Sequence, residues 1–210
     1  MGAASGRAWR GAAGLGRLTG FGGRVVISTV ATVVLVMAIP GSHDRARLEV
    51  RGPPPWPAPV SAQVAAGVDA AGLSLLATPG EVVRYAVHLD VIVNGRPVTV
   101  PAGIGIDSPR HLGAALYTSD TSGIIHVGSD SDRSVFTLGQ FFDEWQVTLT
   151  PERLGGLRAP RYHPVEVYLN GSRVTGDPGS VMLTPHQEIA VTYHPGSVPI
   201  PASYTFPAGT

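Results

Sequence analysis

The chain of 210 residues contains no cysteine and no lysine. The absence of cysteine excludes a disulfide framework, a thiolate metal site and a cysteine nucleophile. A folded domain must therefore rely on its hydrophobic core, and an apolar content of 43% is sufficient for one. All basic residues are arginine, and Ala, Gly and Pro are abundant, which is typical of a GC-rich bacterial genome rather than of a binding role.

The common catalytic and cofactor signatures are also missing. The sequence has no nucleophile elbow, no His-Glu-x-x-His, no phosphate loop and no dinucleotide fingerprint. Ser119, Asp120 and His126 lie close in the sequence, but a catalytic triad is defined by spatial geometry, so their spacing carries little information. We therefore predict a protein that is not an enzyme, with a hydrolase of unrecognised site as an alternative.

Charge is unevenly distributed along the chain. The first acidic residue is Asp44, and it follows four arginines at positions 7, 10, 17 and 24. After Pro40 the chain has 11 Arg against 15 acidic residues. This part is therefore net negative, and it gives no electrostatic reason to expect binding to nucleic acid.

One long apolar run covers Val25 to Ile39 and has no charged residue. At about 1.5 Å per residue it would span roughly 22 Å of a hydrocarbon core about 30 Å thick, which a tilted or locally thinned span with Arg24 snorkelling would accommodate. We predict an uncleaved transmembrane signal anchor over residues 25–40. The Arg-containing residues 1–24 are then cytoplasmic, and the remainder is extracytoplasmic on a single-pass protein of the cell membrane. A cleaved signal peptide and a buried core helix are the alternatives.

The rest of the chain divides by composition. Residues 41–64 contain the proline cluster Pro53 to Pro59, which predicts a stiff linker, with an SH3-type ligand as the alternative. Residues 65–194 are predicted to form the extracytoplasmic β-rich domain. Residues 195–210 are predicted to be a Pro-rich tail on its surface.

Two hairpin signatures dominate the predicted domain. Asn94-Gly95 and Asn170-Gly171 each separate two β-branched runs, the strongest short-range signal for a tight type I′ hairpin. The run from Tyr85 to Val93 alternates apolar and more polar positions, as a half-buried strand does, and places His88 and Asp90 on one face. Further strands are predicted at 123–127 and 188–193.

A single soluble helix is predicted over Thr137 to Trp145. Thr137 and Gln140 have the spacing of a capping box, and the large apolar residues recur at the positions of one helix face. The fold class is therefore mainly β, a hairpin-based sheet or sandwich with one short amphipathic helix, preceded by an N-terminal transmembrane helix.

Histidine and aspartate supply the candidate ligands. His88 and His126, on two predicted strands, could meet across a sheet with Asp120 nearby, and imidazole with carboxylate suits Zn or Cu. The alternative is that each histidine is separately hydrogen-bonded or exposed. Apart from the membrane, the predicted partner is an envelope protein or a small ligand of unknown identity.

Several longer segments resemble an uncharacterised prokaryotic family of exported or membrane-anchored proteins, known by its sequence pattern and not by an established activity. These segments, all between about 65 and 209, are Ala71-Gly-Leu, His88-Leu-Asp-Val91, Asn94-Gly95, Pro97 to Asp107, Asp120 to Val127, Phe136 to Trp145, Gly176-Asp-Pro178 and Tyr204 to Gly209.

The resemblance implies a histidine-rich cluster that would bind metal in other members. This chain departs from that pattern, because Arg84 and Ala86 stand where histidines often occur and Leu116 to Asp120 replaces a His-Thr-His run. Only His88, Asp120 and His126 remain of the implied cluster. The resemblance therefore implies that any metal site of this member is weakened or lost. The prediction from the whole sequence is a non-enzymatic binding or structural module of the bacterial envelope, with a residual metal-binding protein as the alternative.

Overall fold

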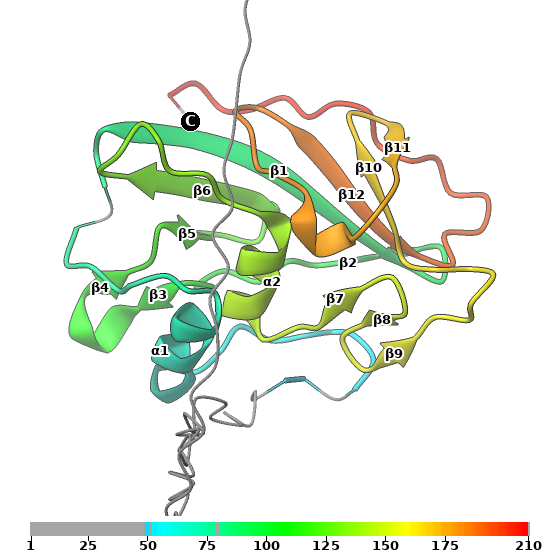
Figure 1. Cartoon of the computed structure of the whole chain (residues 1–210), viewed down its shortest axis with the longest axis horizontal. Coiled ribbons are helices and arrows are strands. Elements are labelled where there is room, and N and C mark those ends of the chain that lie inside the picture. The colour runs from blue at the N-terminus through cyan, green and yellow to red at the C-terminus, as the bar shows by residue number, and fades with distance from the viewer. Residues whose placement is uncertain (1–48, 51, 79, 210) are drawn as a thin grey trace, which may run out of the picture. The chain divides into compact units, whose positions relative to one another are not determined.

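The computed structural model describes residues 49–209 except 51 and 79. The predicted transmembrane helix at 25–40 lies outside the described residues, and no helix within them combines the length and the apolar character needed to cross a membrane. The described part is mainly β, as predicted, with two short α-helices (Figure 1).

Seven strands form one mixed sheet in the order β11-β10-β12-β1-β6-β5, with β2 also paired to β1. Its members are β1 (Val83–Val93), β2 (Arg96–Val98), β5 (Leu116–Tyr117), β6 (Ile124–Ser129), β10 (Glu166–Leu169), β11 (Ser172–Val174) and β12 (Glu188–Tyr193). β1 is the central strand: it runs parallel to β12 and antiparallel to β2 and β6.

Smaller elements surround this sheet. They are α1 (Ser61–Ala70), α2 (Leu138–Trp145), the 3₁₀ turns η1 (Ser108–Arg110) and η2 (Pro178–Ser180), the pair β3 (Ile106–Asp107) and β4 (Leu112–Gly113), and the three-stranded β7 (Leu149–Thr150), β8 (Arg153–Leu154) and β9 (Leu157–Arg158).

Both predicted hairpins are confirmed. β1 and β2 are joined by Asn94 and Gly95, with φ of 51° and 72°, and β10 and β11 by Asn170 and Gly171, with φ of 50° and 77°. Both central residues of each turn therefore lie in the left-handed region that a type I′ turn requires, which Asn and Gly tolerate best.

The predicted helix is also confirmed as α2. The Thr137 hydroxyl accepts a hydrogen bond from the Gln140 backbone N–H at 3.3 Å, and the Gln140 side chain accepts one from the Thr137 N–H at 3.0 Å. This capping box satisfies two donors that the start of a helix leaves free. The apolar face of α2 is buried in the main core.

A second helix, α1, was not predicted. It is rich in Ala and weakly amphipathic, so the hydrophobic pattern does not reveal it. Its Gly67 allows close approach to α2, since a Cβ at that position would lie 2.7 Å from the Glu144 carbonyl oxygen.

Residues 52–64, assigned above to a linker, instead belong to the folded domain. The Trp56 side chain is buried against Trp145, with ring centroids 5.9 Å apart, and its Nε1–H donates to the Gly52 carbonyl at 3.0 Å. The proline pattern predicted the extended backbone of this segment but not its packing, because the binding surface for Trp56 comes from residues about 90 positions away.

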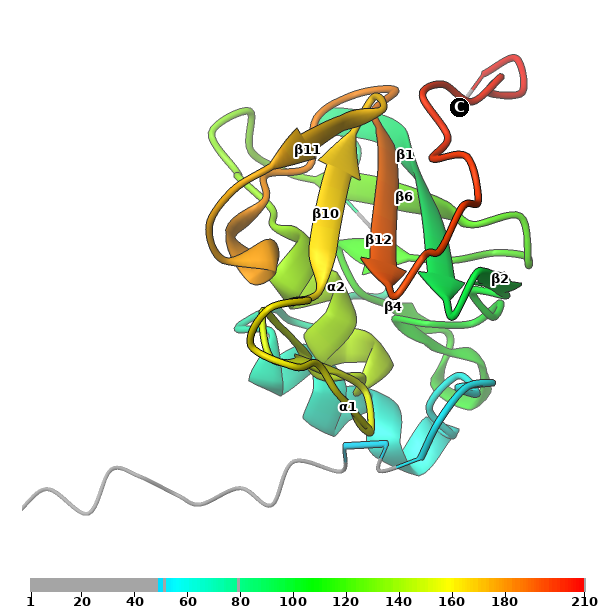
Figure 2. The ribbon, with the colours of Figure 1, turned by 90° about the vertical axis from the view of Figure 1, so that its right-hand side faces the viewer.

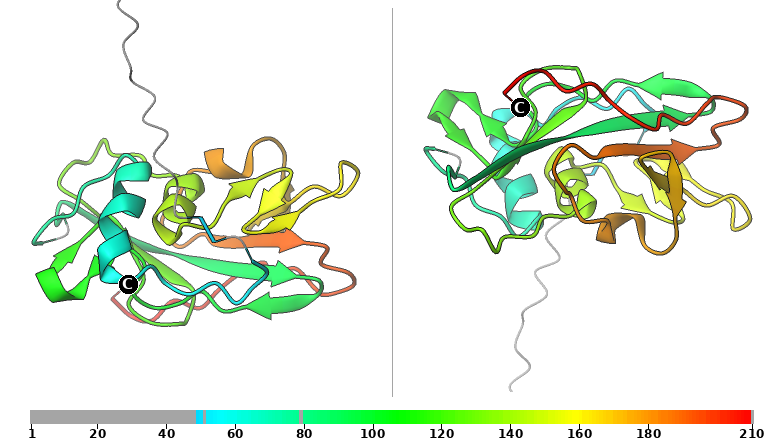
Figure 3. Two further views of the ribbon diagram at one scale, coloured as in Figure 1. Left: turned by 90° about the horizontal axis from the view of Figure 1, so that it is seen from below. Right: turned by 90° about the horizontal axis from the view of Figure 1, so that it is seen from above.

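The two faces of the sheet are covered differently. The face that carries Val87, Leu89 and Val91 packs against α2 in the main core. The C-terminal segment after β12 crosses the opposite face, which we call the outer face (Figure 2; both views in Figure 3). The outer face is therefore buried in part, and His88 on it is only 6% exposed.

Candidate metal centre

His88, Asp90 and Glu188 come together on the outer face. His88 and Asp90 are two residues apart on β1, so their side chains leave the strand on the same side. Glu188 begins β12 and is the register partner of His88 in the parallel β1–β12 pair. Sheet geometry alone therefore places three potential ligands next to one another.

The three side chains are in close contact. His88 Nδ1 lies 2.8 Å from Glu188 Oε2 and 3.9 Å from Asp90 Oδ2. One ligand atom from each residue lies within 4.8 Å of the other two, the only such group of three His, Asp or Glu residues found in the described part of the chain. Glu188 is 1% exposed, whereas the Asp90 side chain is 34% exposed, so the group opens to solvent on the Asp90 side.

The members of the group perturb one another electrostatically, and the pKa values of Glu188 and His88 are both raised. Burial and the neighbouring Asp90 carboxylate raise the pKa of Glu188, although the hydrogen bond and charge of His88 act to lower it. Burial lowers the pKa of His88, but the hydrogen bond and charge of Glu188 outweigh it, so that pKa is raised. Glu188 Oε1 has no hydrogen-bond partner, and neither carboxylate is paired with a described arginine.

The second nitrogen of His88 is held by the backbone. Nε2 lies 2.8 Å from the Ser122 carbonyl oxygen, which can only accept, so Nε2 carries a proton. In the neutral ring the lone pair is then on Nδ1, which faces the carboxylates. Metal-binding histidines have this arrangement, in which the outer N–H donates to a carbonyl and fixes the ring.

Two further contacts fix the position of the His88 ring. Gly123, at φ +87°, lets the loop before β6 pass close to β1, since a Cβ there would lie 2.6 Å from the Leu89 carbonyl oxygen. The Tyr204 ring of the C-terminal segment stacks on His88, with centroids 3.7 Å apart and planes at 6°. Loop and tail therefore hold the imidazole from two sides.

Of the other predicted ligands, His126 lies elsewhere on the outer face and Asp120 lies in the loop between β5 and β6. His126 is the register partner of Ala86, its Nε2 lies 3.1 Å from the Ser119 hydroxyl, and its ring stacks on Tyr117. Asp120 accepts a hydrogen bond from the Ser122 N–H at 2.8 Å. Neither belongs to the group around His88.

His126 remains close enough to Asp120 for their charges to interact. Burial lowers the pKa of His126, the charge of Asp120 opposes that effect, and Arg84 adds to it. Their role as metal ligands stays a prediction.

Sequence reasoning did not single out Asp90 and Glu188 as ligands. The alternation along β1 does place Asp90 beside His88, and that signal was available. Glu188 is 100 residues from His88, and only the parallel register of β1 with β12 brings it there, which no local pattern predicts. No family model, curated protein or solved structure matches this chain.

Proposed function

We propose that this protein is a non-enzymatic binding module of the bacterial envelope, anchored through residues 25–40, which binds Zn²⁺ or Cu²⁺ through His88, Asp90 and Glu188. The observation that carries the metal assignment is the Glu188 carboxylate, which is 1% exposed, has an unpartnered oxygen and faces a second carboxylate. His88 contacts only one oxygen of this carboxylate, and Asp90 adds a second carboxylate beside it, so a divalent cation that binds all three side chains would satisfy the remaining oxygen and balance the two carboxylates.

The ligand geometry fits such an ion. Zinc binds imidazole nitrogen at about 2.0–2.1 Å and carboxylate oxygen at about 2.0–2.2 Å, so two of its ligand atoms lie at most about 4.3 Å apart. The separations of 2.8 Å and 3.9 Å from His88 Nδ1 to the two carboxylates are within that limit, and all three ligand atoms lie within 4.8 Å of one another, so small side-chain shifts would bring them onto one ion. Three protein ligands with a water molecule would form an open site, and two carboxylates balance the charge of the ion.

Zinc and copper titration of the full-length protein tests this proposal. We expect binding in the micromolar range or tighter, and a loss of about 100-fold in Glu188→Gln, which removes the buried charge and leaves the shape of the side chain. Cu²⁺ should bind more tightly than Zn²⁺, following the general order of divalent affinities.

His126→Ala is the matched control, because it removes a histidine from the same face outside the group. Unchanged affinity in His126→Ala with loss in Glu188→Gln is the expected pair of results. The reverse pair would instead assign the ion to His88, His126 and Asp120, and no binding by the wild type would refute metal binding altogether.

One observation favours a hydrolase as a second candidate. The Ser119 hydroxyl lies 3.1 Å from His126 Nε2, within reach of a nucleophile and its general base, and the charge of Asp120 acts on the same imidazole. The main proposal predicts that a fluorophosphonate probe leaves Ser119 unmodified, as judged by intact-protein mass spectrometry. Stoichiometric labelling that disappears in His126→Ala would favour the hydrolase.

A further inference from the structure

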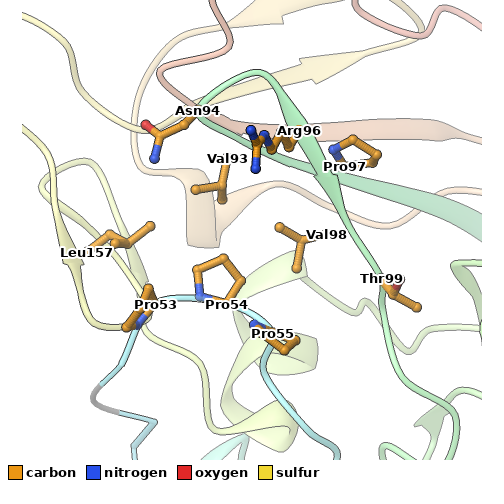
Figure 4. Close-up of a pocket in the computed structure, with 10 residues that line it drawn as sticks. All are labelled: Pro53, Pro54, Pro55, Val93, Asn94, Arg96, Pro97, Val98, Thr99 and Leu157. Carbon is orange, nitrogen blue, oxygen red and sulfur yellow. The ribbon is translucent and has the colours of Figure 1, made fainter.

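A pocket of about 600 Å³ opens between the β1–β2 hairpin and the proline segment before α1 (Figure 4). One wall is formed by Pro53, Pro54 and Pro55, and the other by hairpin residues that include Val93 and Val98. Binding sites for small molecules typically have volumes of about 300–1,000 Å³ and mostly apolar walls with a few polar groups. The pocket has both properties.

The proline wall is fixed by buried contacts behind it. Trp56, directly after Pro55, is buried in the core and hydrogen-bonded to the Gly52 carbonyl, which also accepts from the Gly156 N–H at 3.2 Å. Gly155 approaches the indole so closely that a Cβ there would lie 2.7 Å from ring atoms. A ligand would therefore enter a preformed site with little ordering of the protein.

The opposite wall is equally constrained, and it is unsuited to an added strand. Val93 is buried in the main core, with Val98 packed against the same core. β2 has no other strand partner than β1 among the described elements, but its central residue is Pro97, which has no N–H to donate. Proline on an edge strand discourages pairing with another chain, so a small ligand fits this pocket better than an extended peptide.

The pocket carries one charge, and its sign is positive. Arg96 is the only ionisable side chain among the lining residues, and it makes no ion pair with any described acid. Figure 4 shows it on the hairpin side beside Val93 and Asn94, with the prolines across from it. A guanidinium with free donors binds carboxylate or phosphate, and the absence of an acid disfavours a cationic ligand.

We propose that this pocket binds a small amphiphile with an apolar body and one anionic head group, whose body lies between the prolines and the two valines while its head pairs with Arg96. The site is independent of the proposed metal centre, because Val93 and Val98 belong to the inner side of the sheet and His88 to the outer side. Either proposal can fail without the other.

Calorimetric titration of the full-length protein in zwitterionic lipid nanodiscs tests the inference. Octanoate has an aliphatic body and 3-phenylpropionate has an aromatic one. The acid that binds more tightly indicates which kind of apolar body the pocket prefers. Octylamine, which has the same body with a cationic head, and acetate, which has no body, are expected not to bind.

Arg96→Glu should weaken binding of the preferred acid at least tenfold, while Arg96→Lys should retain part of it. The matched control is Arg133→Glu, another exposed arginine outside the pocket, which should leave the affinity unchanged. Failure of both acids to bind at millimolar concentration would overturn the inference, as would equal affinity in Arg96→Glu and the wild type. Because Arg96 is exposed, an unchanged unfolding midpoint confirms that this variant folds.

Discussion

Replacing Trp145 with alanine is expected to lower the free energy of unfolding by about 3–5 kcal/mol, the usual range for deleting a large buried aromatic side chain. Trp145 is 0% exposed and lies at the meeting point of the aromatic core, with ring centroids 5.9 Å from Trp56, 5.5 Å from Phe142 and 6.2 Å from Phe141. Alanine would leave a cavity between α2 and the segment that contains Trp56.

Urea unfolding followed by far-ultraviolet circular dichroism measures this loss. Trp145→Phe should be less damaging, because it keeps most of the apolar contacts and removes an indole N–H that is buried without a hydrogen-bond partner. Tyr162→Ala is the control, since Tyr162 is 88% exposed and its removal should change stability by less than about 0.5 kcal/mol. A loss below 1 kcal/mol in Trp145→Ala would contradict the packing described above.

The parts of the fold that were predicted are those encoded by local chemistry. Asn-Gly turns specify their hairpins because few residues accept positive φ twice in succession. α2 was predicted with nearly its observed ends because Thr137 and Gln140 cap it and its apolar face is continuous. In both cases neighbouring residues contain the whole signal.

The parts that were missed depend on distant residues. α1 has little amphipathic pattern, and its place is set by Gly67 against the α2 backbone. Trp56 appeared to belong to a spacer because prolines surround it, yet its indole fills the core. A periodicity search has no access to such contacts, because the partner surface is assembled from remote elements.

The candidate site also combines features that neighbouring residues encode with features that depend on distant residues. His88 was identified because it lies on the more polar face of an alternating strand, and its neighbour Asp90 follows from the period of that strand. Glu188 required the parallel β1–β12 register, and the covering Tyr204 required the path of the tail. The sequence therefore predicted His88 as a ligand, whereas its closest partner, Glu188, is found only from the strand topology.

Replacing Glu144 is expected to have the second large effect on the free energy of unfolding. It lies on α2, is 1% exposed, and neither carboxyl oxygen has a hydrogen-bond partner. Gly105 makes room for it, since a Cβ at Gly105 would lie 2.8 Å from Oε2. Burial raises the pKa of Glu144 well above its usual range. The folded protein must therefore either keep this carboxyl protonated or tolerate an unpaired buried charge.

The raised pKa of Glu144 determines how the free energy of unfolding changes with pH. A carboxyl whose pKa is higher in the folded state than in the unfolded state binds its proton more tightly when folded. Its contribution to stability is complete below the unfolded pKa and is lost as the pH rises toward the folded pKa. The wild type should therefore lose stability between pH 4 and pH 8 relative to a variant with no ionisable group at this position.

Glu144→Gln is that variant, because the amide has nearly the same shape and no charge. We expect it to match the wild type near pH 4 and to exceed its free energy of unfolding by about 2–4 kcal/mol at pH 8, the scale of an uncompensated buried charge. Glu144→Met should gain as much or more at pH 8, because it also removes the unpartnered polar atoms. Urea unfolding at the two pH values measures both differences.

Glu152→Gln provides the matched control, since it makes the same chemical change at an exposed position and should give no difference at either pH. The comparison of each variant with the wild type at one pH cancels the titration of His88 and Glu188, which are present in every chain. If the gap for Glu144→Gln were equal at pH 4 and pH 8, the carboxyl could not be the group that titrates. A stabilising variant inside α2 would also show that this helix is held by its aromatic face in spite of Glu144, because all of its other buried side chains are apolar.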